Sequence, residues 1–315
     1  MYYIILISVL FVVELIYFRI ADHYNIVDKP NHRSSHTSVT LRGGGVIFVI
    51  AMIIGCILGY TSIAFSLAVT LVGVVSFIDD IKPLSQLPRV SSHLIAVVLI
   101  LFDLGMLETG MIYWLPVLLV LAIGWINAFN FMDGINGITV LYALISIISF
   151  GILYQNDKSF DILVIMGIAC LVFAFFNVRK KAKTFAGDVG SVSMALFLSY
   201  FMIKLIFETG EIGYLLFFSI YGIDAVVTIL YRLKDKENIF KPHRSHLYQF
   251  LANELKWPHI LVAVVYSVLQ LLLNYCVILM IDNNVLTIPV FALLLIGLTF
   301  LYTIARILVL KKITV

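Results

Sequence analysis

The stretch Asn127-Ala-Phe-Asn-Phe-Met-Asp-Gly-Ile-Asn-Gly137 joins two apolar runs. It therefore lies where two predicted membrane helices meet at one surface. Asn127, Asn130, Asp133 and Asn136 recur every three residues within it. Because helical neighbours at that spacing share a face, at least Asn130 and Asp133 can point into one pocket. Their oxygens suit a hard cation, a sugar or a base, whereas a polar turn between helices is the simpler alternative.

The composition is that of an integral membrane protein. Of the 315 residues, 62% are hydrophobic and only 12% are charged, whereas a soluble protein carries about 25% charged residues. No early apolar run ends in a small-residue cleavage site, so we expect the first helix to be retained. Cys56, Cys170 and Cys276 all lie within apolar runs and lack metal-ligand spacing, which favours buried thiols over a disulfide framework.

Apolar runs long enough to cross a bilayer, about 17–25 residues each, predict an all-α polytopic membrane protein with a single domain over residues 1–315. The runs lie at about 3–20, 44–60, 62–78, 90–107, 111–126, 138–154, 161–177, 189–207, 212–231, 259–280 and 285–310. These make eleven transmembrane helices, with ten as the alternative because the runs at 111–126 and 138–154 are short.

The basic residues divide the connecting loops into two sets. If eleven helices alternate, one set of loops and helix ends carries 19 of the 21 Lys and Arg residues, and only Lys158 and Lys204 fall elsewhere. The positive-inside rule makes the basic side cytosolic, which places the N-terminus outside and the C-terminus in the cytosol. The polar motifs lie on the same side, so we expect the active site at the cytosolic face.

Carboxylates stand at two further points on this side. Asp79 and Asp80 end the third apolar run, and adjacent acids repel each other unless a cation or proton intervenes. A solvated helix end is the alternative interpretation. Asp188, within Gly187-Asp-Val-Gly-Ser191, begins a later run, where a helix N-terminus favours an anion and the glycines leave room for a ligand.

Two loops on the basic side carry further polar groups. The first reads Asp28-Lys-Pro-Asn-His-Arg-Ser-Ser-His36 and closes with Arg42-Gly-Gly-Gly45, whose glycines either present N–H groups to an anion or allow close packing. The largest, over residues 232–258, contains Lys241-Pro-His-Arg-Ser-His246. Apolar residues at helical spacing follow it, so residues 246–256 predict an amphipathic helix on the membrane surface.

Together these motifs supply carboxylates, amide oxygens, histidines and many cationic groups. Oxygen ligands with few cysteines suit Mg²⁺, or Mn²⁺ as an alternative, rather than zinc. A metal with Lys and Arg neutralises phosphoryl oxygens during group transfer. Since the motifs lie at a membrane surface, one substrate can be a lipid phosphate and the other a soluble phosphorylated metabolite.

The motif set resembles that of the polyprenyl-phosphate N-acetylhexosamine-1-phosphate transferases of glycosyltransferase family 4. The match extends from about residue 28 to residue 250. The motifs that carry it are Asp79-Asp80, Asn127-x-x-Asn130-x-x-Asp133-Gly134, Gly187-Asp188-x-Gly190-Ser191, Pro30-Asn-x-Arg33-x-x-His36 with Gly44-Gly45, and His243-Arg-x-His246. Each motif is moderately specific alone, and their order and topology agree with the family.

The resemblance implies transfer of a HexNAc-1-phosphate from a UDP-sugar to undecaprenyl phosphate, with release of UMP. This reaction starts a bacterial cell-surface polysaccharide such as O-antigen or capsule. The resemblance also implies Mg²⁺ dependence and a multi-pass location in the bacterial inner (cytoplasmic) membrane. A homodimer is compatible with it, and we expect no nucleic acid partner.

By position, the resemblance gives the acidic motifs specific roles. Asp188 is the expected metal ligand, with Asn130 as the second. Asp79 and Asp80 would hold or deprotonate the lipid phosphate, whose oxygen attacks the β-phosphorus of the nucleotide sugar. Asp133 would bind the nucleotide or assist catalysis. A single displacement is favoured over a covalent aspartyl intermediate, because a phosphate monoester is already a competent nucleophile.

The remaining predicted site residues bind substrate. Phe185 corresponds to an aromatic residue that packs against uracil, and His243, Arg244 and His246 would contact the diphosphate. The other predicted substrate-binding residues are Lys29, Asn127 and Asn136.

Two departures from the family pattern bear on the donor. Asn136 stands where family members usually carry a second acid, so an acid–base role there is in doubt. His-Arg-Ser-His-Leu-Tyr-Gln over residues 243–249 looks more like the branch that uses UDP-GlcNAc or a deoxy-amino sugar such as FucNAc or QuiNAc. The alternatives are a phospho-MurNAc-pentapeptide transferase of peptidoglycan synthesis and, from another class, a secondary transporter with intramembrane acids.

Overall fold

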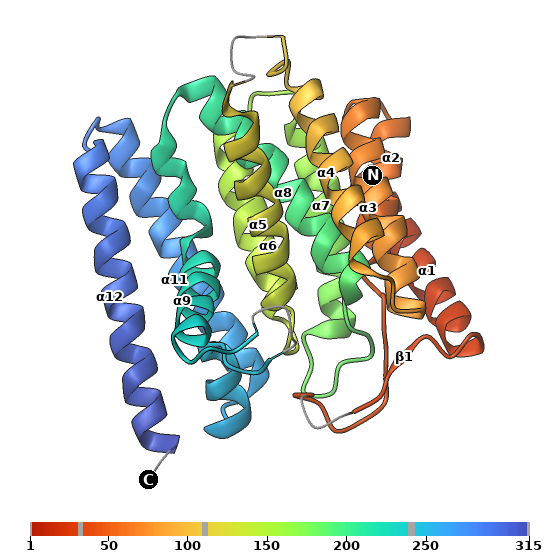
Figure 1. The fold of residues 1–315 in the computed structure, drawn as a ribbon. Helices are drawn as coiled ribbons and strands as arrows, with labels where there is room; N and C mark the ends of the chain where they lie inside the picture. The colour runs from red at the N-terminus through yellow and green to blue at the C-terminus, as the bar shows by residue number, and fades with distance from the viewer. Residues whose placement is uncertain (1, 31–33, 109–112, 239–242, 314–315) are drawn as a thin grey trace.

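Eight helices are long and apolar enough to cross a membrane in the computed structural model, which describes residues 2–30, 34–108, 113–238 and 243–313 (Figure 1). They are α1 (Tyr2–His23), α3 (Ile63–Ile81), α4 (Gln86–Asp103), α7 (Phe160–Asn177), α8 (Gly187–Thr209), the 3-10 helix η2 (Ile212–Phe218) continued by α9 (Ser219–Lys234), α11 (His259–Asp282) and α12 (Ile288–Ile313). Shorter apolar helices are α2 (Val46–Ile57), α5 (Leu115–Phe131) and α6 (Ile138–Leu153). The prediction of an all-α polytopic membrane protein is confirmed.

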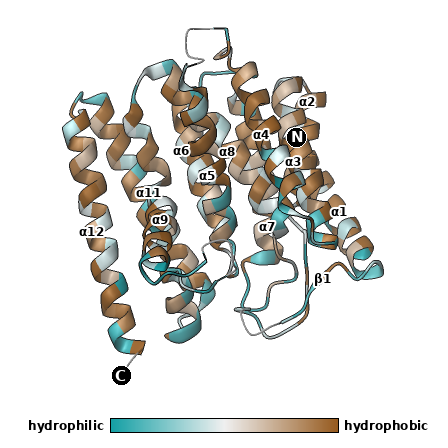
Figure 2. Ribbon diagram, in the orientation of Figure 1, coloured by the Kyte–Doolittle hydropathy of each residue, from teal (hydrophilic) through white to brown (hydrophobic). Residues whose placement is uncertain are grey.

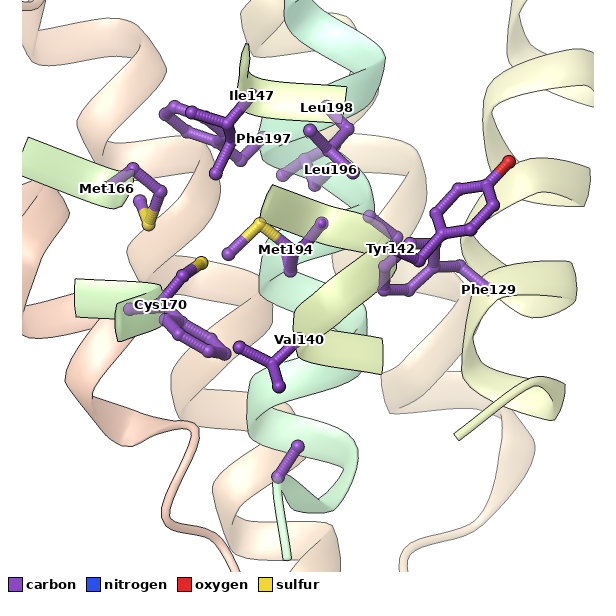
Figure 3. Close-up of a cluster of buried hydrophobic side chains, with 14 of the residues drawn as sticks. Phe129, Val140, Tyr142, Ile147, Met166, Cys170, Met194, Leu196, Phe197 and Leu198 are labelled. Atoms are coloured by element: carbon purple, nitrogen blue, oxygen red, sulfur yellow. The ribbon is translucent and has the colours of Figure 1, made fainter. Parts of the chain in front are cut away.

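Helix α8 lies at the centre of the bundle. It contacts α2, α3, α4, α5 and α6, and 78% of its most apolar window is buried. From Val189 to Ser199 its residues are all apolar or small, as expected for a helix surrounded by other helices. Figure 3 shows Met194, Leu196 and Phe197 of α8 within the core, beside Val140 and Tyr142 of α6.

Helix α12 lies at the opposite extreme of burial. Only 6% of its most apolar window is buried, and in Figure 1 it stands at the edge of the bundle. Its apolar surface is therefore suited to lipid. The hydrophilic residues gather instead at helix ends and connecting segments, as Figure 2 shows.

A two-stranded ribbon fixes the long connection between α1 and α2. Strand β1 (Val27–Asp28) pairs antiparallel with β2 (Thr40–Leu41). Leu41 also forms a parallel bridge with Thr184, whose side-chain hydroxyl donates to the Leu41 carbonyl oxygen at 3.2 Å. The bridge holds the start of the glycine segment next to the loop that precedes α8. Arg33, which the motif comparison used, lies outside the described residues.

The segment predicted as a surface helix over residues 246–256 contains α10 (Leu247–Gln249) and the π-helix η3 (Phe250–Glu254). Its apolar side faces protein, because Leu247 and Tyr248 are buried. The Tyr248 hydroxyl donates to the Phe131 carbonyl oxygen at 2.9 Å. A side chain on Gly134 would place its Cβ 2.2 Å from that hydroxyl oxygen. The segment therefore packs onto the loop after α5, and its contact with a membrane surface stays a prediction.

Candidate active site

The glycine segment after β2 packs directly against the first turn of α8. The N–H groups of Gly44 and Gly45 donate to the carbonyl oxygens of Phe185 and Ala186, at 2.9 and 3.0 Å. A side chain on Gly45 would place its Cβ 2.1 Å from the Cα of Gly190, so this crossing requires glycine. Of the two interpretations of the glycines, the structure therefore supports close packing.

Asp80 is completely enclosed by the protein. Its Oδ1 accepts hydrogen bonds from Arg42 Nε at 2.7 Å and from the Asp188 N–H at 2.9 Å, and its Oδ2 accepts from the Val189 N–H at 3.0 Å. Both N–H groups belong to the first turn of α8, where helices have unpaired donors, so Asp80 caps that helix. We predicted that Asp80 acts on the lipid phosphate. That role stays a prediction, and in the structure both carboxylate oxygens have partners within the chain.

Asp79, the neighbouring acid, is arranged differently. Its Oδ1 accepts a hydrogen bond from the Leu84 N–H at 2.6 Å, and its Oδ2 lies 3.3 Å from Arg89 Nη1. Arg89 also reaches Asp188, with 3.7 Å between Nη2 and Oδ2. Asp79 and Asp188 therefore share one guanidinium, which keeps two like charges close together.

Asp188 stands at the centre of the polar cluster. Besides Arg89, its carboxylate meets Arg42, with 3.4 Å between Nη2 and Oδ1. The side-chain amide of Asn130 lies 3.3 Å from the same Oδ1 and donates to Ser191 Oγ at 2.8 Å. The two residues predicted as metal ligands, from α5 and α8, are thus brought together.

Asp133 lies in the loop between α5 and α6. Its carboxylate accepts a hydrogen bond from the Thr139 hydroxyl at 2.5 Å. Burial raises the pKa of the Asp133 carboxyl to about 6, although the hydrogen bond from Thr139 acts in the opposite direction. The group therefore changes charge close to the pH at which cells work.

If activity needs the ionised form of Asp133, kcat/KM should fall as pH drops through about 6. Thr139→Val removes a hydrogen bond that stabilises the charged form, so the pKa should rise and the acidic limb should move about one unit toward higher pH. Measuring kcat/KM between about pH 5 and pH 8 tests whether the acidic limb moves. Thr209→Val, at the far end of α8 from Asp188, is the control, because the Thr209 hydroxyl donates to the Leu205 carbonyl oxygen and accepts from the Glu211 N–H. An unmoved limb would mean that another group limits activity at low pH.

A cavity of about 300 Å³ lies at one end of the bundle, and Asp79 and Asp80 are not among its lining residues. Five of the predicted site residues line it: Asn130, Asp133, Asn136, Phe185 and Asp188. Phe185 is half-buried, and its ring meets the His36 ring edge-on, with 4.8 Å between centroids. Asn136 ties the cavity wall together, because its side-chain amide donates to the Arg179 carbonyl oxygen at 2.8 Å.

Two predicted substrate-binding residues do not line this cavity. Asn127 donates its side-chain amide to the Ile123 carbonyl oxygen at 2.8 Å, one turn earlier in α5. Lys29 is exposed on the chain just beyond the cavity residue Asp28. Their binding roles stay predictions.

The histidine segment also lies outside the cavity lining. His246 is buried, and its Nδ1 lies 2.9 Å from Asp224 Oδ1. His243 Nδ1 lies 2.9 Å from Ser245 Oγ, and burial lowers the pKa of His243 to about 4. Arg244 forms an ion pair with Glu254 at 3.3 Å. Their predicted diphosphate contacts remain untested by this geometry.

Several cavity residues were not among the predicted site residues. The most informative are Arg42, Asn177, Gln249 and His259. Gln249 accepts a hydrogen bond from the His246 N–H at 3.2 Å, so the histidine segment reaches the cavity through this residue. Arg42 directly precedes the three glycines, and that position was the available sequence signal, whereas its contacts with Asp80 and Asp188 come from the fold.

Comparison with known proteins agrees with the site. Residues 62–206 match the family model described as glycosyl transferase family 4. The matched segment runs from the start of α3 into α8 and carries Asp79, Asp80, Asn130, Asp133 and Asp188.

The chain is similar to curated relatives of two names. A phospho-N-acetylmuramoyl-pentapeptide-transferase of Streptococcus agalactiae is 30% identical over 213 residues, which cover 56% of this chain and 62% of the relative. An undecaprenyl-phosphate alpha-N-acetylglucosaminyl 1-phosphate transferase of Thermotoga maritima is 27% identical over 260 residues, which cover 81% of this chain and 82% of the relative. The chain therefore spans less than two thirds of the streptococcal relative. With the acidic motifs collected at one end of a helical membrane bundle, these matches show that the chain is similar to glycosyl transferase family 4 over residues 62–206.

Proposed function

We propose that the protein transfers a HexNAc-1-phosphate from a UDP-sugar to undecaprenyl phosphate and releases UMP. The reaction would start a surface polysaccharide at the inner membrane of a bacterium. The observation that carries the proposal is the meeting of Asn130, Asp133 and Asp188 in one cavity at an end of the bundle. The names of the streptococcal and Thermotoga relatives support a polyprenyl-phosphate sugar-phosphate transferase.

The donor set at the cavity fits Mg²⁺. No group of three His, Cys, Asp or Glu side chains with metal-binding geometry occurs among the residues described. Mg²⁺ is usually bound by one or two carboxylates together with substrate phosphates and water. Asp188 would hold the ion, with the Asn130 amide oxygen beside it after reorientation of the amide. When bound, Mg²⁺ would neutralise charge on the diphosphate of the donor.

The chain's own residues would then position the two phosphates. An oxygen of the lipid phosphate attacks the β-phosphorus of the UDP-sugar. The bond from that phosphorus to the bridging oxygen breaks, and UMP leaves with the bridging oxygen. Arg42 and Arg89 keep the carboxylates of Asp188 and Asp79 in place, and they bring positive charge to the site where phosphoryl oxygens meet. Asp79, the less enclosed of the paired acids, is the better candidate to meet the lipid phosphate.

The donor sugar has a specific second candidate. The streptococcal similarity favours UDP-MurNAc-pentapeptide, whereas the Thermotoga similarity covers more of the chain and favours UDP-GlcNAc. We place UDP-GlcNAc and related amino sugars first. The polar groups gather at one end of the bundle, so the geometry gives no support to the transporter alternative.

A donor panel tests this proposal. Purified protein is incubated with undecaprenyl phosphate, Mg²⁺ and either UDP-GlcNAc, UDP-FucNAc, UDP-QuiNAc or UDP-MurNAc-pentapeptide. With one of the first three donors we expect UMP release and a lipid product whose mass equals that of the acceptor plus the sugar-1-phosphate of that donor, less one water. EDTA should stop the reaction, and added Mg²⁺ should restore it. Turnover of the muramyl donor alone would overturn the choice of sugar. Substrate-dependent ion flux in proteoliposomes without UMP release would overturn the proposal that the protein is an enzyme.

A further inference from the structure

A second cavity opens beside the candidate active site. Its volume is about 570 Å³, and it shares five lining residues with the first cavity. The shared residues are Ser35, His36, Asn136, Phe185 and His259. Phe185 and His259 thus form a common wall, so a molecule in the second cavity lies next to the first. We call this second cavity the basic vestibule.

Three lysines give the vestibule its charge. Lys180, Lys181 and Lys256 line it, and its lining contains no Asp or Glu. All three lysines are exposed, and none forms an ion pair with an acid in the part of the chain that the structure describes. The active-site cavity differs, because its Arg42 is engaged by Asp80 and Asp188. Positive charge without internal partners therefore concentrates in the vestibule.

The backbone around these lysines is held in place. Asn136 donates to the carbonyl oxygens of Arg179 and Lys180, at 2.8 and 3.5 Å. Lys256 has a left-handed backbone with φ of 58°, in the turn between η3 and α11. The next N–H, from Trp257, donates to the Leu251 carbonyl oxygen at 3.0 Å. Two separate loops are thus anchored so that their lysines face one cavity.

We propose that the basic vestibule captures the nucleoside diphosphate sugar through its phosphates before the donor enters the active-site cavity. The inference rests on the proposed function, because it concerns how the anionic substrate reaches that site. A cleft lined by one sign of charge raises the local concentration of an oppositely charged ligand and its association rate, by about 10- to 1,000-fold. Lysines also attract phosphate-bearing lipids. The phosphate of the lipid acceptor is therefore the other ligand that could bind in the vestibule.

The experiment compares the wild type with the triple variant Lys180→Gln/Lys181→Gln/Lys256→Gln in a neutral detergent. The kcat and KM of each substrate are measured at about 0.02 and 0.5 M salt, where screening is weak and strong. We expect kcat/KM for the donor to fall about tenfold at low salt, with kcat unchanged. The two proteins should converge at high salt, and the KM for undecaprenyl phosphate should not change.

A matched control removes the same charge elsewhere. Lys234→Gln/Lys236→Gln/Lys312→Gln replaces three exposed lysines that line neither cavity, and it should behave as the wild type does. An unchanged donor kcat/KM in the vestibule variant would overturn the inference, and a raised KM for the lipid alone would move the site to the acceptor.

Equilibrium dialysis with UDP at both salt concentrations measures binding of the nucleoside diphosphate without any turnover. Weaker low-salt binding in the vestibule variant supports the inference even if no donor of the panel reacts. The absence of any reacting donor would count against the proposed function, whereas the weaker UDP binding would still support the anion site. Equal UDP binding by the two proteins would overturn the anion site.

Discussion

Asp188→Asn should reduce sugar-phosphate transfer about a thousandfold while the protein still folds and inserts. Asn has the shape of Asp and can still accept hydrogen bonds from Arg42 and from the Asn130 amide, which now lie 3.4 and 3.3 Å from Asp188 Oδ1. It lacks the negative charge that a hard cation requires. The loss should therefore appear in kcat, measured as UMP release at saturating donor and lipid, without a matching loss of melting temperature in detergent.

A Mg²⁺ titration sharpens the test. If Asp188 binds the ion, the variant should need more Mg²⁺ for half-maximal rate than the wild type needs. Asp235→Asn is the matched control, because Asp235 is exposed just beyond α9 and lines neither cavity. Near-normal turnover with an unchanged Mg²⁺ requirement would remove Asp188 from the proposed metal site.

The helices were predictable for a physical reason. A segment that crosses lipid must satisfy its backbone hydrogen bonds internally, as a helix does, and its side chains form one continuous apolar run. The run at 161–177, for example, corresponds closely to α7 (Phe160–Asn177). Connections were harder to predict. Residues 246–256 have apolar spacing that suits a membrane surface and a protein surface equally well. The Tyr248 hydroxyl donates to the Phe131 carbonyl oxygen, which ties one side of the segment to protein, and sequence spacing contains no sign of that contact.

Local spacing likewise predicted only part of the candidate site. Asn130 and Asp133 both line the cavity, as the repeat of three predicted, but α5 ends at Phe131, so Asp133 reaches the cavity from the following loop and not from a shared helical face. His246 is oriented by a contact of another kind, with Asp224 of α9. Asp224 also accepts hydrogen bonds from Tyr266 and Tyr302, at 2.6 and 3.0 Å. These partners come from three helices and a loop, so no periodic pattern marks them.

Asp79 and Asp80 show where sequence reasoning ends. Adjacent acids at the end of an apolar run are equivalent by composition, and we gave them the same role. The fold separates them, because α8 places its unpaired N–H groups against Asp80 alone. Asp79 instead lies between Arg89 and the Leu84 N–H. Their side chains therefore have different partners, and we expect the two alanine variants to behave differently.

Asp80→Ala should destabilise the fold by about 3 kcal/mol. It removes the acceptor for two buried N–H groups and for Arg42, and hydrogen bonds to a charged group contribute about 1.5–3 kcal/mol each. The partial exposure of Arg42, with 34% of its side chain accessible, lets water replace some of that loss. We expect a lower melting temperature in detergent, and faster proteolysis near the start of α8. Asp80→Asn should lose about half as much, because its amide oxygen remains an acceptor.

Asp79→Ala is the variant with which Asp80→Ala is compared. Asp79 gives up one N–H partner and an ion pair with Arg89, whose side chain is 38% exposed, so stability should change little. Activity should nevertheless fall, since Arg89 would lose the carboxylate that holds it near Asp188. If Asp79→Ala lowered the melting temperature and Asp80→Ala did not, the structural role would belong to Asp79 and not to Asp80. Equal melting with equal loss of transfer would instead favour one shared role on the lipid phosphate.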